Sequence, residues 1–222
     1  VIGNISSSGK VKLLDLEFPQ EFLKFFPGPK FGIQGIRDII GVHDRPLLNN
    51  MIKPCTGLSP EKTAELAYQA AVGGVDIIKD DELVANPPHC PLIERVKAVM
   101  PAIQNADRIK GEKTLFAFNI TDRADRIKEN ALKALEAGAN CLMLNYATVG
   151  LDAARMITED PEIDVPILGH SDYVGASTAC EWCGTSTKLM NAKLPRLAGL
   201  DMIIALSPYG KFPMLMDTFI DC

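Results

Sequence analysis

The feature of this sequence that most restricts its fold is a unit that repeats from residue 46 onward. Each unit has a short apolar segment, a polar or glycine-bearing loop, and a segment with the apolar periodicity of an amphipathic helix. The apolar segments are rich in β-branched and aliphatic residues, as is typical of strands buried on both faces of a sheet. The expected strands are 46–53, 75–79, 114–119, 140–145, 165–169 and 202–206. The pattern therefore predicts parallel strands joined by right-handed helical crossovers.

Helical segments lie between these strands, and their boundaries have clear signals. Ser59 followed by Pro60 is typical of a helix N-terminus. Glycines precede the next strand at Gly73-Gly74, Gly138 and Gly199, where helices end with a left-handed residue. The expected helices include 60–72, 123–137, 151–158 and 186–198. A TIM (β/α)8 barrel has eight such units. The sequence predicts this fold with about six of the eight units present.

The first 45 residues have a different pattern. Residues 4–16 have weak strand character, 19–26 favour a short helix, and 27–30 form a Pro/Gly turn. We expect 1–45 to be a lead-in from an N-terminal domain that is missing here, and 46–222 to be an incomplete (β/α) barrel catalytic domain. Since the first residue is Val1 and not Met, the sequence indicates a fragment, a processed chain or an incompletely represented one.

Composition excludes some functions. Apolar residues make up 47% and charged residues 23% of the chain, which is ordinary for a globular protein. A net charge of -5, with both signs interspersed, argues against a nucleic-acid partner. No apolar run is long enough to span a bilayer and no signal peptide opens the chain, so no membrane association is expected. The six scattered cysteines are typical of reduced thiols, which predicts a cytoplasmic protein.

Cys180 and Cys183 form the motif C-E-W-C. This spacing fits a redox dithiol or half of a zinc site. A zinc site needs two further ligands, and the sequence contains no second C-x-x-C or paired histidines. Unpaired thiols in a loop are therefore the favoured interpretation.

The second strand ends in I-I-K-D-D-E, which places charged residues where barrel active sites form. Lys79 and Asp81 are two residues apart and share one direction, and Glu82 follows. Two carboxylates at one place repel unless a cation joins them, and oxygen ligands favour Mg2+. A buried Lys79 with a lowered pKa can react with CO2 to give a carbamate, a third oxygen ligand. The alternative is a salt bridge at the strand end, with Lys79 neutralised by Asp81.

Four further residues lie at strand ends or in the loop that follows. Lys53 follows the first strand and is a candidate general acid or base, or a solvated lysine. His170 follows Gly169 at the fifth strand end, and we interpret it as functional and not a core residue. Asn119 ends the third strand and either orients a substrate hydroxyl or caps the next helix. Lys211 lies in the glycine-bearing loop after the sixth strand, which is either a lid over an anionic substrate or an exposed loop.

Taken in order, these motifs resemble the catalytic domain of RuBisCO large subunits. G-G-V-D-I-I-K-D-D-E at 73–82 resembles the family's activation segment. G-P-K-F-G-I-Q-G-I-R-D at 28–38, R-P-L-L at 45–48 and I-K-P at 52–54 precede it, and G-H at 169–170 and G-K at 210–211 follow it. The resemblance covers essentially the whole chain, and the ordered set is far more specific than any single motif.

The resemblance implies a role for each candidate residue. Lys79, Asp81 and Glu82 correspond to the Mg2+ ligands, with a CO2-derived carbamate on Lys79. Lys53 corresponds to the proton-transfer lysine and Lys211 to the lysine of the mobile loop. His170 corresponds to a residue that contacts the substrate. The resemblance also implies a homodimer or higher homo-oligomer, in which an N-terminal domain of the partner completes the active site.

The sequence departs from the carboxylases at positions that matter for chemistry. Cys55 stands where they have a second lysine, and Met51 where they have a threonine. Ser171 replaces a phosphate-contacting arginine, so the bidentate recognition that arginine provides is lost there. These changes resemble the RuBisCO-like proteins of form IV, which do not fix CO2.

We therefore expect an Mg2+-dependent enzyme that enolises a sugar phosphate, as an isomerase, an enolase or tautomerase, or a decarboxylase. The alternatives are a non-catalytic truncated RuBisCO-like module and a genuine ribulose-bisphosphate carboxylase. Isomerisation, tautomerisation and decarboxylation share an enolate, so the sequence does not choose among them.

Overall fold

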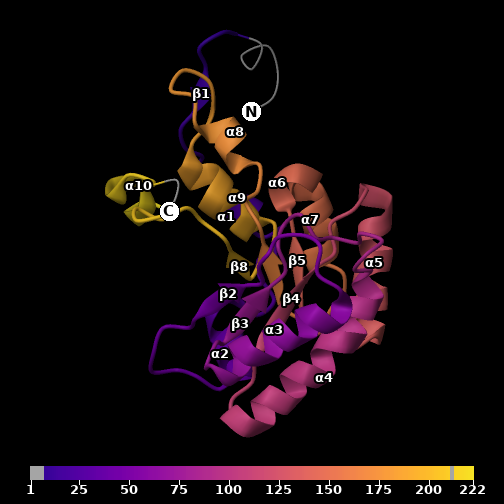
Figure 1. Cartoon of the computed structure of the whole chain (residues 1–222). Coiled ribbons are helices and arrows are strands. Elements are labelled where there is room, and N and C mark those ends of the chain that lie inside the picture. Colours follow the sequence, from indigo (N-terminus) through magenta and orange to yellow (C-terminus); the bar gives the residue numbers. More distant parts are fainter. Residues whose placement is uncertain (1–7, 211–212) are drawn as a thin grey trace.

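The computed structural model describes residues 8–210 and 213–222. Within them, six parallel strands form one curled sheet in the order β2-β3-β4-β5-β6-β8 (Figure 1). The strands of this sheet are β2 Asn49–Met51, β3 Ile77–Lys79, β4 Leu115–Asn119, β5 Cys141–Leu144, β6 Ile167–Gly169 and β8 Met202–Ile203. The sheet is the partial barrel that the βα repeats predict.

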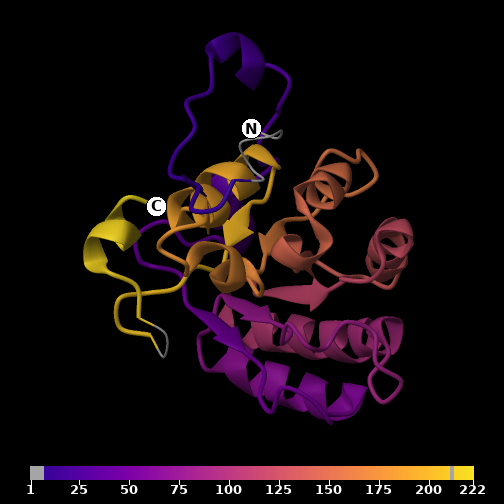
Figure 2. The same ribbon diagram turned by 90° about the horizontal axis from the view of Figure 1, so that it is seen from above.

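Helices connect the strands and cover the outer face of the sheet. They are α3 Pro60–Val72, α4 Leu92–Lys110, α5 Ala124–Glu136, α6 Tyr146–Val149, α7 Leu151–Thr158, α8 Val174–Thr178, the π-helix Leu189–Lys193 and α9 Leu194–Leu197. The pair α3 and α4 lie side by side along the sheet (Figure 2). Outward-facing strand residues such as Phe116, Phe118 and Leu142 are fully buried against these helices. This apolar layer is the larger of two cores, and it holds the strands in register.

The second core lies on the inner face of the sheet, and α2 Gly32–Ile40 covers it. Ile36 and Ile40 of α2 are buried there. They pack with inward-facing strand residues, which are Ile77, Leu115, Ala117, Cys141, Met143 and Leu168. Because side chains alternate along a strand, residues two apart share the inner face, and Lys79 and Asn119 continue these rows. The inner face is therefore apolar under α2 and polar at the carboxyl ends of the strands.

Asp201, just before β8, joins α2 to the sheet. Its Oδ1 accepts hydrogen bonds from the amides of Phe31 and Gly32, at 2.7 and 3.0 Å. Its Oδ2 accepts one from the amide of Ile167 in β6, at 2.9 Å. Asp201 is 6% exposed, so these amides have little access to water. One carboxylate thus accepts hydrogen bonds from backbone amides at the start of α2 and at the start of β6.

Several predicted boundaries match the structure. Residues 60–72 and 151–158 form the helices α3 and α7, and 123–137 contains α5. The predicted helix 186–198 is interrupted by the π-helix. The prediction that the strands are buried on both faces is confirmed for β3, β4, β5 and β6, whose residues are all buried. It is wrong for β2, whose three residues are exposed at one edge of the sheet.

The N-terminal segment contacts the rest of the chain at several places, among them hydrogen bonds from Lys30 to the carbonyl of Ile163 and from Arg155 to that of Phe25. Two further contacts are made by its regular elements. In its expected strand, β1 Lys12–Leu13 pairs in parallel with β7 Gly184–Thr185, and α1 Gln20–Leu23 is the expected short helix. The second contact is α2. The interpretation of 1–45 as a lead-in from another domain stays a prediction, and residues 4–7 of the expected strand segment lie outside the described residues. Near the other end, α10 Met216–Ile220 follows β8.

Across residues 8–210 and 213–222, no helix combines the length and the apolar character needed to cross a membrane.

We expect Asp201→Ala to lower the free energy of unfolding by about 3–5 kcal/mol, because three amides lose a buried acceptor. Urea unfolding of the intact protein, followed by circular dichroism, measures this change. Asp44→Ala, at an exposed aspartate without a hydrogen-bond partner among the described residues, is the matched control and should change stability by less than about 0.5 kcal/mol. Equal stabilities of the two variants would contradict the role of Asp201.

Candidate active site

Lys79 ends β3, the strand next to the edge of the sheet, and lies between Met51 of β2 and Ala117 of β4. Its side chain is only 1% exposed, and its Nζ donates a hydrogen bond to the carbonyl of Asp80 at 2.8 Å. Burial lowers the pKa of Lys79, while the nearby carboxylates of Glu82 and Asp81 act in the opposite direction. Lys79 is therefore a buried amine whose neutral form is favoured relative to an ordinary lysine.

Asp81 is bound by Lys53, which approaches from the end of β2. Lys53 Nζ lies 2.6 Å from Asp81 Oδ2, and the amide of Leu83 donates to Oδ1 at 3.1 Å. The hydrogen bond to Asp81 raises the pKa of Lys53, and Cys55 Sγ lies 3.0 Å from the same ammonium group. The alternative interpretation, a salt bridge between Lys79 and Asp81, is wrong because Asp81 is paired with Lys53. A buried carboxylate needs a strong donor, and Lys53 provides it.

Glu82 lies between Lys79 and His170. Its Oε2 is 3.7 Å from Lys79 Nζ and 3.5 Å from His170 Nε2. About a third of the Glu82 side chain is exposed, so this carboxylate faces the open part of the site. Burial lowers the pKa of His170, and the charge of Lys79 adds to that effect. His170 Nδ1 is buried and has no hydrogen-bond partner among the described residues, whereas Nε2 is the ring nitrogen that faces Glu82.

Two asparagines bind the backbone of the acidic segment 80–82 that follows β3. Asn119 Nδ2 donates to the carbonyl of Glu82 at 3.1 Å, and Asn145 Nδ2 donates to the same carbonyl at 3.0 Å. Asn119 Oδ1 also accepts from the amide of Thr121 at 3.1 Å. Thr121 lies before α5, so Asn119 does not cap that helix. Both ends of the Asn119 amide are thus used within the protein. Asn145 was not predicted, although its place after β5 matches that of Asn119 at the end of β4.

A second unpredicted feature is a buried ion pair beneath the loop. Arg95 of α4 is 0% exposed, and its guanidinium lies 2.9 Å from Asp80 Oδ2. It also donates to the carbonyls of Val84, Ala85 and Cys90, so it binds both ends of the loop that follows β3. Burial raises the pKa of Asp80, and the charge of Arg95 opposes that rise. No sequence signal marks Arg95, since an arginine in an amphipathic helix predicts an exposed residue.

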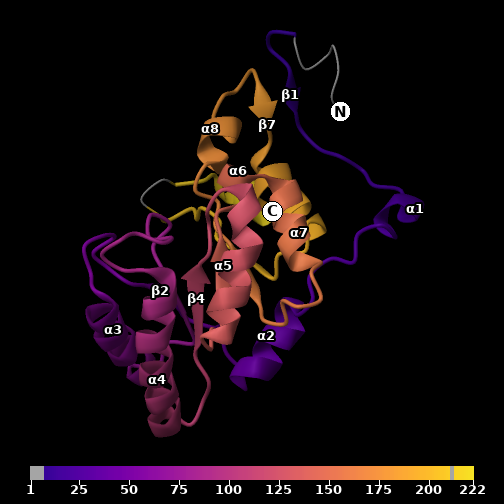
Figure 3. The same cartoon turned by 90° about the vertical axis from the view of Figure 1, so that its right-hand side faces the viewer.

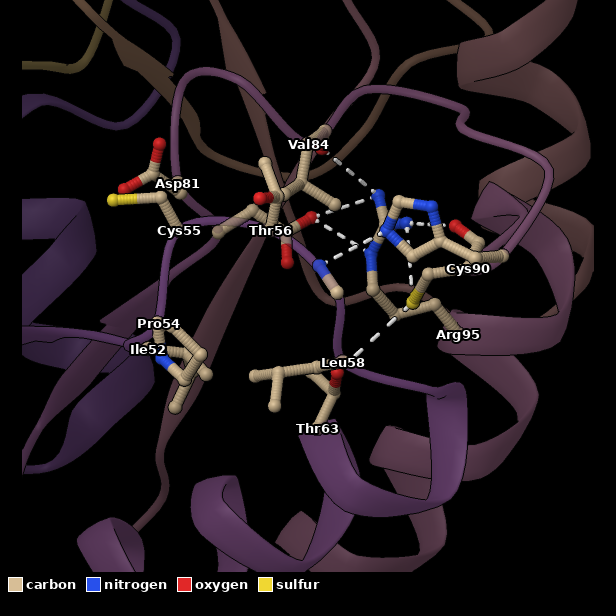
Figure 4. A pocket seen from close by; sticks show the side chains of 13 residues that line it. Ile52, Pro54, Cys55, Thr56, Leu58, Thr63, Asp81, Val84, Cys90 and Arg95 are labelled. Carbon is tan, nitrogen blue, oxygen red and sulfur yellow. Dashed lines mark hydrogen bonds and ion pairs between the residues drawn. The ribbon is translucent and has the colours of Figure 1, made fainter.

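Figure 4 shows Arg95 beside a cavity that also contacts Cys55, Thr56 and Asp81. The cavity has a volume of about 20 Å³, enough for a water molecule and too small for a sugar phosphate. His89 closes one side, where its Nε2 accepts from the amide of Gly57 at 3.2 Å. This cavity therefore does not hold a substrate of that size.

Ser171, one of the departures from the carboxylases, and its neighbour Asp172 both make hydrogen bonds within the protein. Ser171 Oγ donates to the carbonyl of Ile204 at 2.6 Å, so the hydroxyl is used within the protein. Asp172 accepts a hydrogen bond from Thr148 Oγ1. Lys211, predicted to act from the loop after β8, lies outside the described residues.

The side chains at this site can bind a hard metal ion such as Mg2+ only if Lys79 supplies one of the ligands. Within the described ranges, no three His, Cys, Asp or Glu side chains converge in a geometry that could hold a metal. Asp81 and Glu82 supply two carboxylates, and Lys79 is the buried group beside them. A carbamate on Lys79 would make an all-oxygen set, which is the chemistry that Mg2+ prefers.

Fold and site together define a partial (β/α) barrel with a lysine and carboxylate cluster at the carboxyl ends of its strands, where the enzymes of this fold carry out catalysis. Residues 32–213 match the model of the ribulose bisphosphate carboxylase large chain, catalytic domain. The chain therefore belongs to the RuBisCO large-chain family.

Its relatives include proteins named for other functions than carboxylation. A ribulose bisphosphate carboxylase-like protein of Archaeoglobus fulgidus is 53% identical over 221 residues, which are 100% of this chain and 51% of the relative. A 2,3-diketo-5-methylthiopentyl-1-phosphate enolase of Bacillus cereus is 43% identical over 208 residues, 94% of this chain and 50% of the relative. The chain thus spans about half the length of the curated relatives that it matches.

The fold has a solved counterpart. The crystal structure of a rubisco-like protein (MtnW) from Alicyclobacillus acidocaldarius matches with a TM-score of 0.92 and 33% identity. The match covers 98% of this chain and 55% of that chain.

We expect Arg95→Met to lower the free energy of unfolding by about 3–5 kcal/mol, because Asp80 is left as a buried charge without a partner. Adding Asp80→Asn should recover part of the loss, since the uncompensated charge is then removed. Chemical denaturation of the intact protein measures both variants.

Arg126→Met is the control, at an exposed arginine of α5 for which the described part of the chain offers no hydrogen-bond partner. If Arg95→Met behaves like this control, within about 0.5 kcal/mol of the parent, the ion pair does not support the loop.

Proposed function

We propose that this chain is part of an Mg2+-dependent RuBisCO-like enzyme that enolises a sugar phosphate and does not fix CO2. The observation that carries the proposal is the convergence of five side chains at the ends of β2, β3 and β6. They make two groups of contacts: Lys53 lies 2.6 Å from Asp81, and Glu82 lies 3.7 Å from Lys79 and 3.5 Å from His170. Such a cluster of amines, acids and an imidazole is suited to moving a proton next to a polarised carbonyl.

Lys79, Asp81 and Glu82 would hold the metal. Lys79 becomes a ligand when its neutral amine attacks the carbon of CO2, forming a C–N bond, and then loses a proton. Burial of the amine supports this step, because it favours the neutral form that can react. When bound, Mg2+ polarises the substrate carbonyl and stabilises negative charge on its oxygen.

The remaining residues would bind the substrate and move its proton. In enolisation, the C–H bond next to the carbonyl breaks, the proton passes to a base, and the electron pair moves onto the carbonyl oxygen. The Lys53 side chain is half exposed at the edge of the cluster. Its raised pKa favours the ammonium form, so Lys53 is the candidate for returning a proton as a general acid. His170, whose Nε2 lies 3.5 Å from the partly exposed Glu82 carboxylate, is the candidate for contacting a substrate oxygen. Lys211 and Asn119 remain candidates for substrate binding; both amide atoms of Asn119 are already engaged with the loop.

Two positions argue against carboxylation. Cys55 lies beside Lys53, where the carboxylases have a second cation, and a thiol there adds no positive charge near the reacting carbon. Ser171 is bound to the carbonyl of Ile204 and cannot replace an arginine in gripping a phosphate.

For the substrate, we propose a phosphorylated 2,3-diketone of the kind that the Bacillus cereus relative is named for. Its C–H group lies next to one of two adjacent carbonyls, which makes the proton more acidic and suits two-point binding to a metal ion. We also propose a cytoplasmic homodimer as the working unit, on the family resemblance.

The first test is exchange of the substrate C–H for deuterium in D2O, followed by NMR with the intact protein, Mg2+ and the phosphorylated diketone. Lys79→Met should reduce the exchange rate at least about a hundredfold, because the third metal ligand is lost. Lys97→Ala, at an exposed lysine of α4, should leave the rate unchanged. If Lys79→Met exchanges as fast as this control, Lys79 has no catalytic role. A parent protein that neither exchanges nor binds Mg2+ would indicate the non-catalytic module, and CO2 incorporation into ribulose bisphosphate would indicate a carboxylase.

The carbamate has its own readout. With 13C-labelled CO2 and Mg2+, we expect a carbamate resonance in the 13C spectrum of the intact protein that is absent in Lys79→Met and present in Lys97→Ala. Calorimetry should show Mg2+ affinity rising when CO2 is supplied, because metal and carbamate stabilise each other. A spectrum without this resonance, together with Mg2+ affinity independent of CO2, would count against Lys79 as a metal ligand.

A further inference from the structure

The C-E-W-C motif lies in a loop that the proposed enzyme chemistry does not use. This loop, residues 179–183, joins α8 to β7 and is called here the cysteine loop. Cys183 Sγ donates a hydrogen bond to Cys180 Sγ at 3.2 Å, and both residues are exposed. A disulfide has a sulfur–sulfur bond of about 2 Å, so the sulfurs need to approach by only about 1 Å to become bonded.

The ends of the cysteine loop are held together by its neighbours. Gly184 has a φ of +93°, and a Cβ on it would lie 2.2 Å from the carbonyl oxygen of Ser177, so only glycine allows the chain to turn back here. Lys12 Nζ donates to the carbonyls of Thr178 and Cys180, at 3.0 and 2.6 Å. Figure 3 shows α8, β7 and β1 together at one end of the molecule. The close pairing of the sulfurs is therefore built by the fold around them.

The two sulfurs have different environments. The hydrogen bond from Cys183 lowers the pKa of Cys180, and the amides of Trp182 and Cys183 add to this effect, as does the charge of Lys12. The pKa of Cys183 is raised by the same contact with Cys180. Cys180 is thus the sulfur whose thiolate is favoured, and Cys183 is the protonated neighbour.

We propose that Cys180 and Cys183 are a redox-active dithiol that is oxidised to an intramolecular disulfide by low-molecular-weight disulfides. The Cys180 thiolate bonds to one sulfur of the small disulfide, whose own S–S bond breaks and releases one thiolate. Cys183 gives its proton to that thiolate and attacks the Cys180 sulfur. The second small thiolate then leaves and takes up the proton that Cys180 had lost. Two protein thiols are oxidised, and the small disulfide is reduced to two thiols.

The other cysteines lack this combination of features. Cys90 and Cys141 are buried, and burial raises the pKa of Cys141. In the part of the chain that the structure describes, Cys180 and Cys183 are the one pair of cysteine sulfurs in hydrogen-bond contact. A zinc ion would need further ligands, and no group of three metal-binding side chains is present in the described ranges.

The test is equilibration of the intact protein with mixtures of reduced and oxidised glutathione, followed by rapid alkylation and mass spectrometry. Trypsin should release residues 156–188, a peptide that contains Cys180 and Cys183 and no other cysteine. With rising oxidised glutathione, this peptide should lose two hydrogen atoms and resist alkylation, and dithiothreitol should reverse both changes. If both thiols remain fully alkylatable after equilibration with oxidised glutathione alone, the proposal is overturned. Tightly bound zinc on the two thiols would overturn it too.

Single substitutions test the order of the steps. Cys183→Ser should trap a glutathione mixed disulfide on Cys180, and Cys180→Ser should form one on Cys183 several-fold more slowly. The reverse order would overturn the assignment of Cys180 as the attacking sulfur.

Trp182 supplies an optical signal, since it lies between the two cysteines and is the only tryptophan of this chain. Its emission should fall on oxidation because an adjacent disulfide quenches it, and Trp182→Phe should abolish the change. Emission that does not differ between the oxidised and reduced protein would contradict a disulfide at this position.

Discussion

The geometry of the site depends on the burial of charge in four consecutive residues. Lys79, Asp80 and Asp81 are almost completely buried, and Glu82 is partly so. Such a segment is costly to fold unless each charge has a partner. Asp80 is held by Arg95, and Asp81 by Lys53. Because Arg95 also binds three carbonyls of the following loop, the same pair that compensates Asp80 sets the path of the chain after the candidate metal ligands.

The two faces of the sheet have different roles. The outer face contributes mainly to stability, and the inner face carries the candidate site at the ends of its strands. The outer face packs against α3, α4, α5 and α7 in a continuous apolar layer. The inner face is apolar only beneath α2 and becomes polar where the strands end. At that end Gly169 is essential to the packing, since a Cβ there would lie 2.5 Å from Leu200 and 2.9 Å from Tyr146. The strand before His170 thus packs closely enough to bury that residue next to Glu82.

Much of the fold follows from patterns within single segments, and much of the site does not. Helix signals at Ser59-Pro60 and periodic apolar residues predict α3 and α7, and strand-end positions predict where Lys53, Lys79 and His170 lie. The partner of Asp81 was missed because residues two apart on one strand suggest a local pair, whereas Lys53 comes from a neighbouring strand. Arg95 was missed because an arginine in an amphipathic helix predicts an exposed residue. The helix α2 was missed because its partners in the sheet are distant in sequence. The chemical roles of these residues, and of Lys211, stay predictions.

The two asparagines that bind the carbonyl of Glu82 leave its side chain free while its backbone is fixed. Glu82 Oε2 already lies within 4 Å of two different partners, Lys79 and His170. A partly exposed side chain changes rotamer in picoseconds to nanoseconds, far faster than a loop moves. The position of this carboxylate relative to Lys79 and His170 therefore depends on its side-chain torsions, while the backbone that carries it stays fixed.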